Sequence, residues 1–341
     1  MTQGARPPRR ATTIAEVARA AGVSRQTVSN TLNAPHRVHP DTLARVTAAI
    51  EELGYRPDQS ARSLRTGERR IIGYLAPVDD PFDPNPLMAG FLEALVDAAG
   101  TEGHHVLLVR PAPGAERARA AIDELVAARQ VDGLVLADVL PDDARVAHAA
   151  RAGVPFAAFG RTGAQLPQHW ADIDNGAAMA DVVAHLAARG HRRIGFAAST
   201  ADLPWLAARR AGFHAEARRL GLDVVRARSA PGEPAVAALR TLLRGSERPT
   251  AVAAESDLRA LDVYEAIRAE GLAVGPDVAV TGFHDTPLCR HLHPALTSVR
   301  LPLRAIAGAL VRRLLAQVRG EPVPAAGETL ATELVVRASS A

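Results

Sequence analysis

Apolar residues recur every three or four positions in short stretches at the start of the chain. The first stretch predicts a helix that begins after Thr13, which forms a capping-box pair with Glu16. After a three-residue turn, a second helix is expected from Arg25 to Leu32, with Ser24 as its N-cap. This spacing is typical of a helix-turn-helix.

A third helix is expected from about Pro40 to Leu53, because Pro40 is tolerated at a first helical position and Leu53 completes an apolar stripe. We expect Val28 and Leu32 to form the inward face of the second helix. The pattern therefore predicts a small core closed by three helices.

Beyond Arg70 the pattern changes to short apolar runs that alternate with longer amphipathic stretches, and the same rhythm restarts near Ile173. Repeated β-α-β units predict two parallel-sheet subdomains with a cleft between them. Residues 55–68 contain too little apolar surface for a firm helix and are expected to form a hinge. Residues 1–11 read as a disordered basic arm.

The charge of the chain is unevenly distributed. Residues 1–70 contain 12 arginines and 6 acidic side chains, whereas the remainder contains 28 arginines and 31 acidic side chains. A basic N-terminal segment is the electrostatic signature of a phosphate-binding module. Every cationic side chain is an arginine, a bias that a GC-rich coding sequence would also produce.

The composition is that of a globular protein with two or three domains, since 48% of the 341 residues are hydrophobic and 23% are charged. The single cysteine, Cys289, excludes an intramolecular disulfide, and we find no leader and no long apolar run. The cytoplasm is therefore the expected location, with no membrane partner.

The second helix of a helix-turn-helix enters the major groove of DNA and reads base edges from its first residues. Arginine suits guanine and glutamine suits adenine, so Arg25 and Gln26 are candidate base readers. Hydroxyl side chains beside them can bond phosphate or base edges, and Asn30 is a further candidate; the hydroxyl residues are Ser24, Thr27 and Ser29. The alternative is a solvated polar helix face.

The stretch TIAEVARAAGVSRQTVSNTLN, followed by GYRPDQSARSLRTG, resembles the headpiece and hinge of the LacI family of bacterial transcription factors. The resemblance continues through IDNGAAMADVVAHLAARGHRRIGF and the shorter motifs RRAGF, SDLRAL, TGFHDTP and PALTSVRLP. It implies an all-α headpiece joined to a bilobed α/β effector domain like periplasmic sugar-binding proteins. It also implies a homodimer or tetramer on a palindromic operator.

The resemblance assigns residues 1–11 to the arm, 12–56 to the DNA-binding domain, 57–69 to the hinge and 70–341 to the effector-binding and dimerisation domain. It divides this last domain into a first subdomain of about 70–171 and 303–325 and a second of about 172–302 and 326–341. The helix around 87–99 becomes a candidate dimer interface, with packing onto the sheet as the alternative. No heptad repeat follows Arg337 to suggest a coiled coil for a tetramer.

Within the hinge, the resemblance makes Leu64 an apolar wedge that enters a central base step, with Ala61 packing beside its dyad mate. The alternative for Leu64 is an ordinary linker residue. Thr13 and Asp58 complete the implied DNA contacts.

In the effector cleft, the resemblance assigns Arg209 to a sugar hydroxyl or a ligand carboxylate; the alternative is a surface arginine. Phe82 and Asp83 match a contacting loop that is equally suited to a structural role. Trp205 is suited either to stacking on a sugar or to core packing. Ser256 is expected to point into the cleft, whereas its neighbour in SDLRAL, Asp257, is expected to cap a helix.

One position departs from the family pattern. Many family members place an acidic residue that bonds the effector where this chain has His284. A neutral imidazole offers one donor and one acceptor, whereas a carboxylate only accepts. We therefore hypothesise that His284 contacts the effector. A hexose or pentose held through paired hydroxyls becomes a less secure expectation, and a charged or differently shaped ligand is the alternative.

The sequence contains no P-loop, no dinucleotide fingerprint, no nucleophile elbow and no cysteine pair for zinc. We therefore expect no enzyme activity, no cofactor and no metal. The function favoured is a repressor of a catabolic or transport operon that a sugar-like inducer releases. The alternatives are a corepressor-dependent repressor and a solute-binding protein.

Overall fold

The computed structural model describes residues 12–55, 68–76, 86–163, 168–201, 203–229, 235–245, 247–324 and 327–341. The chain divides into two compact units, Met1–Arg69 and Arg70–Ala341. Each unit is described separately below.

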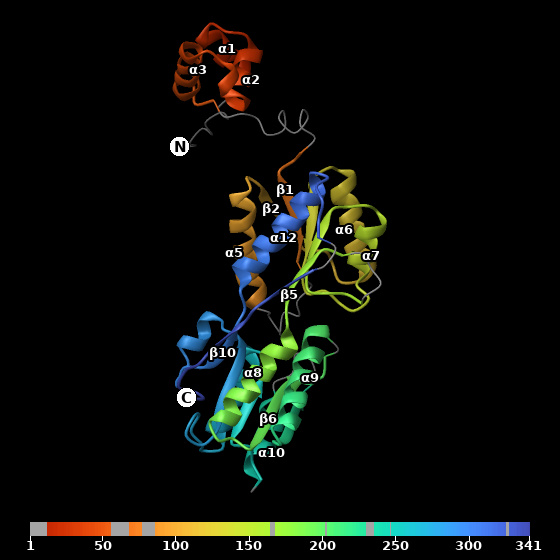
Figure 1. Ribbon diagram of the computed structural model, residues 1–341, viewed down its shortest axis with the longest axis vertical. Coiled ribbons are helices and arrows are strands. Elements are labelled where there is room, and N and C mark those ends of the chain that lie inside the picture. Colours follow the sequence, from red (N-terminus) through yellow and green to blue (C-terminus); the bar gives the residue numbers. More distant parts are fainter. Residues whose placement is uncertain are drawn as a thin grey trace, which may run out of the picture. The chain divides into compact units, whose positions relative to one another are not determined.

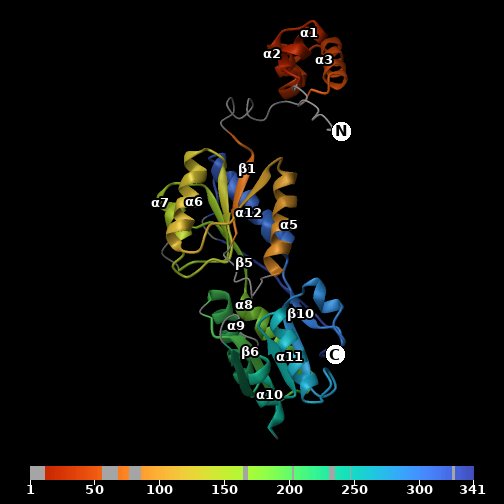
Figure 2. The ribbon, with the colours of Figure 1, turned by 180° about the vertical axis from the view of Figure 1, so that it is seen from behind.

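The first unit is a three-helix domain, as the apolar pattern predicted (Figures 1 and 2). Thr13 caps α1 (Ile14–Ala21) in a complete capping box with Glu16, and Gly22 ends the helix in the left-handed conformation. The other elements are α2 (Arg25–Asn33), the 3₁₀ helix η1 (Pro35–Arg37) and α3 (Pro40–Glu52). Val17, Val28 and Val46 are fully buried, one from each α-helix.

Two leucines of this unit differ from expectation. Leu32 and Leu53 were expected on inward faces, but their side chains are 36% and 37% exposed. Both lie at the ends of their helical stripes, where a domain this small has no further layer to cover them. The core is therefore smaller than the periodic pattern predicted.

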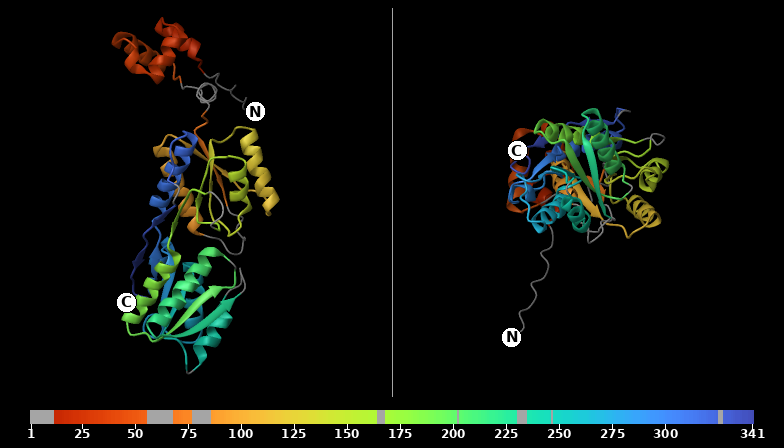
Figure 3. Two further views of the ribbon diagram at one scale, coloured as in Figure 1. Left: turned by 45° about the vertical axis from the view of Figure 1, so that its right-hand side comes forward. Right: turned by 90° about the horizontal axis from the view of Figure 1, so that it is seen from below.

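The second unit has two lobes, each built on a six-stranded sheet (Figures 1 and 3). The first sheet has the order β11-β5-β4-β3-β1-β2, and all its strands are parallel. Helices α5 (Pro86–Thr101) and α12 (Leu303–Val318) cover one face, and α6 (Ala115–Ala127) and α7 (Ala144–Arg151) cover the other. The strands are β1 (Ile71–Leu75), β2 (His105–Val109), β3 (Gly133–Leu136), β4 (Phe156–Phe159), β5 (Trp170–Ile173) and β11 (Glu328–Leu330).

The second sheet has the order β12-β10-β9-β8-β6-β7 and is parallel except for the β10–β12 pair. Helices α8 (Asn175–Ala188) and α9 (Pro204–Arg219) pack together on one face, opposite α10 (Val236–Arg244) and α11 (Asp257–Ala269). The remaining elements are β6 (Arg193–Ser199), β7 (Asp223–Ser229), β8 (Ala251–Ala254), β9 (Ala279–His284), the 3₁₀ helix η2 (Pro287–Arg290), β10 (Thr297–Arg300) and β12 (Glu333–Val335). The expected fold of two β-α-β lobes is thus confirmed.

The chain crosses between the lobes three times: after β5, after β10 and after β11. Two of these crossings differ from the expected subdomain limits. Ile173 still belongs to the first sheet, and β11 also joins that sheet although residues 326–341 were assigned to the second subdomain. A three-residue strand has too few positions for its apolar pattern to reveal which sheet it joins.

Helices α8 and α9 approach each other closely because glycines face each other at their contact. A Cβ atom on Gly212 of α9 would overlap the backbone of Gly176 in α8. Only a residue without a side chain allows the two backbones to lie this close. This contact positions the beginnings of both helices beside the cleft between the lobes.

We expect Gly212→Ala to lower the free energy of unfolding by roughly 1–3 kcal/mol, because α8 and α9 must move apart. Urea denaturation followed by circular dichroism measures the loss. Gly100→Ala is the control, since Gly100 lies in α5 with open space around its Cβ position and alanine favours a helix. Equal losses in both variants would contradict the steric explanation.

Candidate functional site

The start of α2 presents an exposed polar face in the first unit. The hydroxyl of Ser24 accepts a hydrogen bond from the Thr27 backbone N–H at 3.1 Å, which caps the helix. Gln26 Nε2 donates to Asn30 Oδ1 at 2.9 Å, one helical turn away. Arg25 and Gln26 are exposed, whereas Thr27, Ser29 and Asn30 are partly buried.

The side chains on this face suit the edges of DNA bases. Arg25 forms no ion pair or hydrogen bond with the part of the chain that the structure describes, so its guanidinium is available to a partner. The bond from Gln26 to Asn30 holds both amides on one side of α2. Thr13 is also exposed, but its hydroxyl is engaged in capping α1, where it bonds Glu16 Oε2 at 3.0 Å. Asp58, Ala61 and Leu64 lie outside the described residues.

A second candidate site is a pocket between the two lobes of the second unit. It has an empty volume of about 830 Å³, which includes space open to solvent. The first lobe contributes residues that follow β3, β4 and β5, and the second lobe contributes the beginnings of α8 and α9 and the end of β9. The polar residues among those that line it are Asp138, Arg161, Asp172, Asp174, Asn175, Arg209 and His284. Ligands of α/β proteins generally bind at such carboxyl ends of parallel strands.

Arg209 lies at the floor of this pocket, and its side chain is only 2% exposed. Its Nε donates to Asn175 Oδ1 at 2.9 Å, and one terminal nitrogen donates to the backbone carbonyl of Glu255 at 2.6 Å. The guanidinium stacks on Phe283 at 3.6 Å and on Trp205 at 4.6 Å from the ring centroids. Burial lowers the pKa of Arg209 to about 9, against the opposing effect of nearby carboxylates.

His284 completes the floor as a neutral side chain. The second terminal nitrogen of Arg209 lies 3.2 Å from His284 Nε2. Because a guanidinium can only donate, His284 Nε2 accepts this bond and the ring proton lies on Nδ1. Burial and the charge of Arg209 hold the pKa of His284 well below its usual value. The imidazole therefore presents an N–H donor, and no acceptor remains on its ring.

Trp205 links the second lobe to the first. Its indole Nε1–H donates to Asp138 Oδ1 at 3.2 Å, and Asp138 follows β3 of the first lobe. Asp138 has a positive φ of 52°, a conformation that a non-glycine residue adopts only with local support. The bond to Trp205 is a direct polar contact across the cleft.

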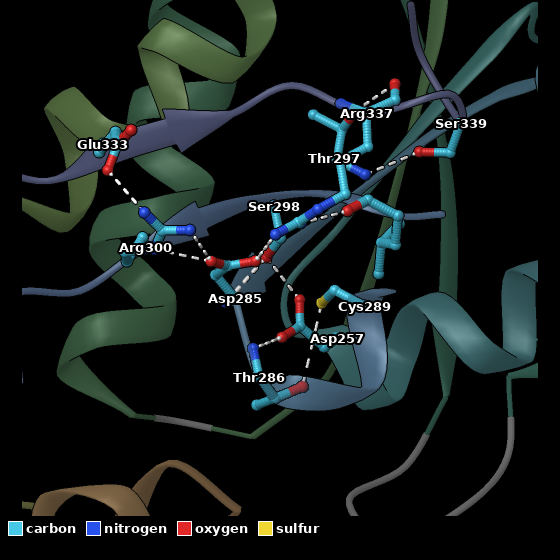
Figure 4. Close-up of polar contacts among 11 residues, drawn as sticks. Asp257, Asp285, Thr286, Cys289, Thr297, Ser298, Arg300, Glu333, Arg337 and Ser339 are labelled. Carbon is cyan, nitrogen blue, oxygen red and sulfur yellow. Dashed lines mark hydrogen bonds and ion pairs between the residues drawn. The ribbon is translucent and has the colours of Figure 1, made fainter. Parts of the chain in front are cut away.

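The loop that carries His284 is held by buried polar contacts (Figure 4). The Asp285 side chain, 3% exposed, pairs with Arg300 at the end of β10 at 2.7 Å and with Arg337 after β12 at 2.6 Å. The Asp285 backbone N–H donates to Ser298 Oγ at 3.0 Å. His284 and Asp285 both have positive φ, of 110° and 49°. The surrounding bonds therefore hold two consecutive strained residues in place.

Asp257 supports the same loop, contrary to the expected capping role (Figure 4). Its carboxylate accepts from the Thr286 N–H at 2.8 Å and from Ser298 Oγ at 2.6 Å. Ser256 is the residue that caps α11, since its hydroxyl accepts from the Arg259 N–H at 3.1 Å. Ser256 is not among the described residues that line the pocket, so its expected position in the cleft is corrected.

The other expected pocket residues divide into two groups. Trp205, Arg209 and His284 line the pocket together. Phe82 and Asp83 lie outside the described residues. The sequence analysis missed Asp138 and Asn175, which also line the pocket and whose only local signal is that they follow short apolar segments, β3 and β5 of the structure.

We expect Asp285→Asn to lower the free energy of unfolding by about 3 kcal/mol, because two arginines lose their charged partner in a buried setting. Thermal and urea denaturation measure this loss. Glu333→Gln is the matched control: Glu333 pairs with the same Arg300 but is 65% exposed, so we expect a change within about 1 kcal/mol. A loss from Glu333→Gln as large as that from Asp285→Asn would refute the assignment.

Both units of the chain match known protein families. Residues 13–58 match the family described as "Bacterial regulatory proteins, lacI family", and residues 183–340 match "Periplasmic binding protein-like domain". The HTH-type transcriptional regulator CelR of Thermobifida fusca is 31% identical over 97% of this chain and 99% of its own. The HTH-type transcriptional repressor CytR of Escherichia coli (strain K12) is also 31% identical, over 97% of this chain and 96% of its own.

Solved structures agree with these matches. A complex of the transcriptional regulator CelR with cellobiose is 30% identical and has a TM-score of 0.69 over 96% of this chain and 99% of that one. The Lac repressor dimer bound to operator and the anti-inducer ONPF is 27% identical, with a TM-score of 0.80 over 97% of this chain and 99% of that one. Across the residues described here, no helix has the length and apolar character needed to cross a membrane.

Proposed function

This chain belongs to the LacI family of bacterial regulatory proteins, and we propose that it represses transcription by binding a palindromic operator as a homodimer. The observation that carries this proposal is the start of α2, where Arg25 and Gln26 stand exposed on a capped helix. A bidentate arginine selects guanine and a bidentate glutamine selects adenine. We therefore assign base reading to these two side chains.

The remaining DNA contacts are proposed from the family resemblance. Hydroxyl and amide side chains beside the base readers would bond phosphates or base edges and fix the register of the helix; they are Thr13, Ser24, Thr27, Ser29 and Asn30. In the hinge, Leu64 would act as the intercalating wedge beside Ala61, with Asp58 nearby in sequence. Unstacking one base step costs a few kcal/mol, which the additional contacts of bent DNA offset.

We propose that a small molecule in the pocket between the lobes controls operator affinity. Three chain crossings connect the lobes, and the Trp205–Asp138 bond spans the cleft, so an occupant that touches both lobes alters their relative orientation. A relative is described in complex with cellobiose, which supports a sugar or sugar derivative as the effector. Such an effector shifts the population between two states by its difference in affinity for them.

The first lobe offers a surface for the second copy of the chain. Val96 on α5 is 49% exposed and Leu108 on the neighbouring β2 is 51% exposed, although both are large apolar residues. A twofold dimer buries the same patch from both copies. We place the dimer interface on α5 and β2, and the Lac repressor relative is described as a dimer.

Operator binding also implies where the protein works and what it does not do. A regulator of this kind acts on the chromosome, so we propose a cytoplasmic, nucleoid-associated protein without catalytic activity. The relatives are named as transcriptional regulators, which supports this proposal.

We expect Arg25→Ala and Gln26→Ala each to weaken operator binding by about tenfold to a hundredfold, because a bidentate base contact contributes roughly 1–3 kcal/mol of discrimination. Gel-shift titrations on DNA from the protein's own promoter region, at several salt concentrations, measure the effect. The losses should be much smaller on unrelated DNA, where no base is read.

Arg45→Ala is the control, because it removes the same charge from an exposed position on α3. We expect it to change binding to operator and unrelated DNA by the same factor. If the protein binds no promoter palindrome more tightly than unrelated DNA, the proposed function is wrong. The same titrations with effector added distinguish an inducer from a corepressor by the direction of the change.

A further inference from the structure

The buried guanidinium of Arg209 bonds only neutral groups among the described residues. Its hydrogen bonds go to an amide oxygen, a backbone carbonyl and an imidazole nitrogen, all of which are uncharged. Within the described part of the chain, no Asp or Glu side chain forms an ion pair with it. A charge that is 2% exposed is costly to bury unless a counter-charge accompanies it. The carboxylates of Glu255, Asp172 and Asp257 favour the charge of Arg209 only through space. The pocket thus contains a cation whose direct hydrogen-bond partners are all neutral.

The floor of the pocket also presents hydrogen-bond donors without matching acceptors. Arg209 has five N–H groups and uses three of them, so each terminal nitrogen retains one. Asn175 accepts from Arg209 through Oδ1, which leaves both N–H groups of its amide without a partner among the described residues. His284 contributes the N–H on Nδ1. Three residues that line the pocket therefore retain five N–H groups that no described residue accepts from.

Asn175 is also the first residue of α8, a helix of 14 residues. The start of this helix adds little attraction for an anion, because the Asp174 carboxylate already caps it through the Ala177 N–H. The N–H groups of Arg209, Asn175 and His284 are therefore the features that favour an oxygen-rich, negatively charged group.

The carboxylates that line the pocket are engaged elsewhere. Asp138 accepts from Trp205, Asp174 caps α8 through the Ala177 N–H, and Asp172 lies 3.5 Å from Arg161. Burial also raises the pKa of Asp172, which lowers its tendency to carry charge. None of these carboxylates forms an ion pair with Arg209, although Asp172 favours its charged form through space.

We propose that the effector is a sugar derivative with an anionic group, a carboxylate in the first instance, which binds Arg209, Asn175 and His284. This inference rests on the proposed effector role of the pocket and specifies its ligand class. Position 284 decides the class: an acidic residue there would pair with Arg209 and repel an anion, whereas neutral His284 leaves the cation to the ligand. Charge-assisted, bidentate bonds to a carboxylate are stronger than those to a hydroxyl.

The test compares matched neutral and anionic probes on the full-length protein. D-glucuronate and D-galacturonate are paired with D-glucose and D-galactose, and acetate is paired with acetamide at equal ionic strength. Glucose 6-phosphate distinguishes a phosphate from a carboxylate as the anionic group. The readouts are the melting temperature and the tryptophan fluorescence, since Trp205 lines the pocket.

We expect at least one uronate to bind about tenfold or more tightly than its neutral sugar, and acetate to raise the melting temperature more than acetamide. His284→Asp should lose this preference by at least about tenfold, because its carboxylate supplies the missing counter-charge. Arg209→Gln should also lose it. The controls His291→Asp and Arg218→Gln make the same charge changes at exposed positions and should retain it.

The inference is overturned if neutral sugars bind as well as their uronates, if no anionic probe changes either readout, or if His284→Asp keeps the preference of the wild type. If the protein prefers only glucose 6-phosphate, the proposed anion-binding site stands, and the anionic group of the effector is a phosphate in place of a carboxylate. If Arg209→Gln fails to fold, His284→Asp alone tests whether the preference for anionic ligands depends on the charge at the pocket floor. Gel shifts without any probe test operator binding separately, so failure of the regulator proposal and failure of the anionic effector give different results.

Discussion

The buried carboxylate of Asp285, which pairs with two arginines, is the constraint on which the effector-binding unit depends. One carboxylate joins Arg300, the last residue of β10, to Arg337, which follows β12. Both strands adjoin segments that cross between the lobes. Replacing a buried pair by apolar residues is often neutral, but removing a single partner is strongly destabilising. The structure therefore depends on all three charges being present together.

The ion pairs of Asp285 also affect the pocket, because Asp285 directly follows the pocket residue His284. His284 precedes Asp285, and its φ of 110° is maintained because the next residue is fixed by two arginines and by Ser298. The resulting direction of the imidazole brings Nε2 to Arg209. Asp285 thus supports both the polar floor of the pocket and the ends of two segments that cross between the lobes. A ligand that displaces His284 therefore also acts on these segments.

Local features of this chain could be predicted from its sequence, because the interacting groups are close together in it. The capping box of Thr13 and Glu16 spans three residues, and the helix and strand periods of the two lobes are read over short windows. The bonds that build the pocket are different. The bonded residues Asn175 and Arg209 are 34 positions apart in the sequence, and Asp138 and Trp205 are 67 positions apart. No periodicity signals such pairs, since they follow from how sheets and helices pack.

Neighbouring residues show the same limit on a smaller scale. Ser256 caps α11 in place of Asp257, because either side chain is a good helix cap and only the backbone path decides which one faces the start of the helix.

His284 illustrates the opposite case, in which a departure from a recognised motif drew attention to a residue that lines the pocket. The structure adds what the motif lacked: the imidazole accepts a hydrogen bond from Arg209 through Nε2, which leaves the N–H on Nδ1 as a donor. An anionic effector of the kind we propose would gain most from Arg209 where both lobes surround the ligand and exclude water, because charges attract more strongly in a low dielectric. The same burial that lowers the pKa of Arg209 would then link the charge of the ligand to contacts with both lobes.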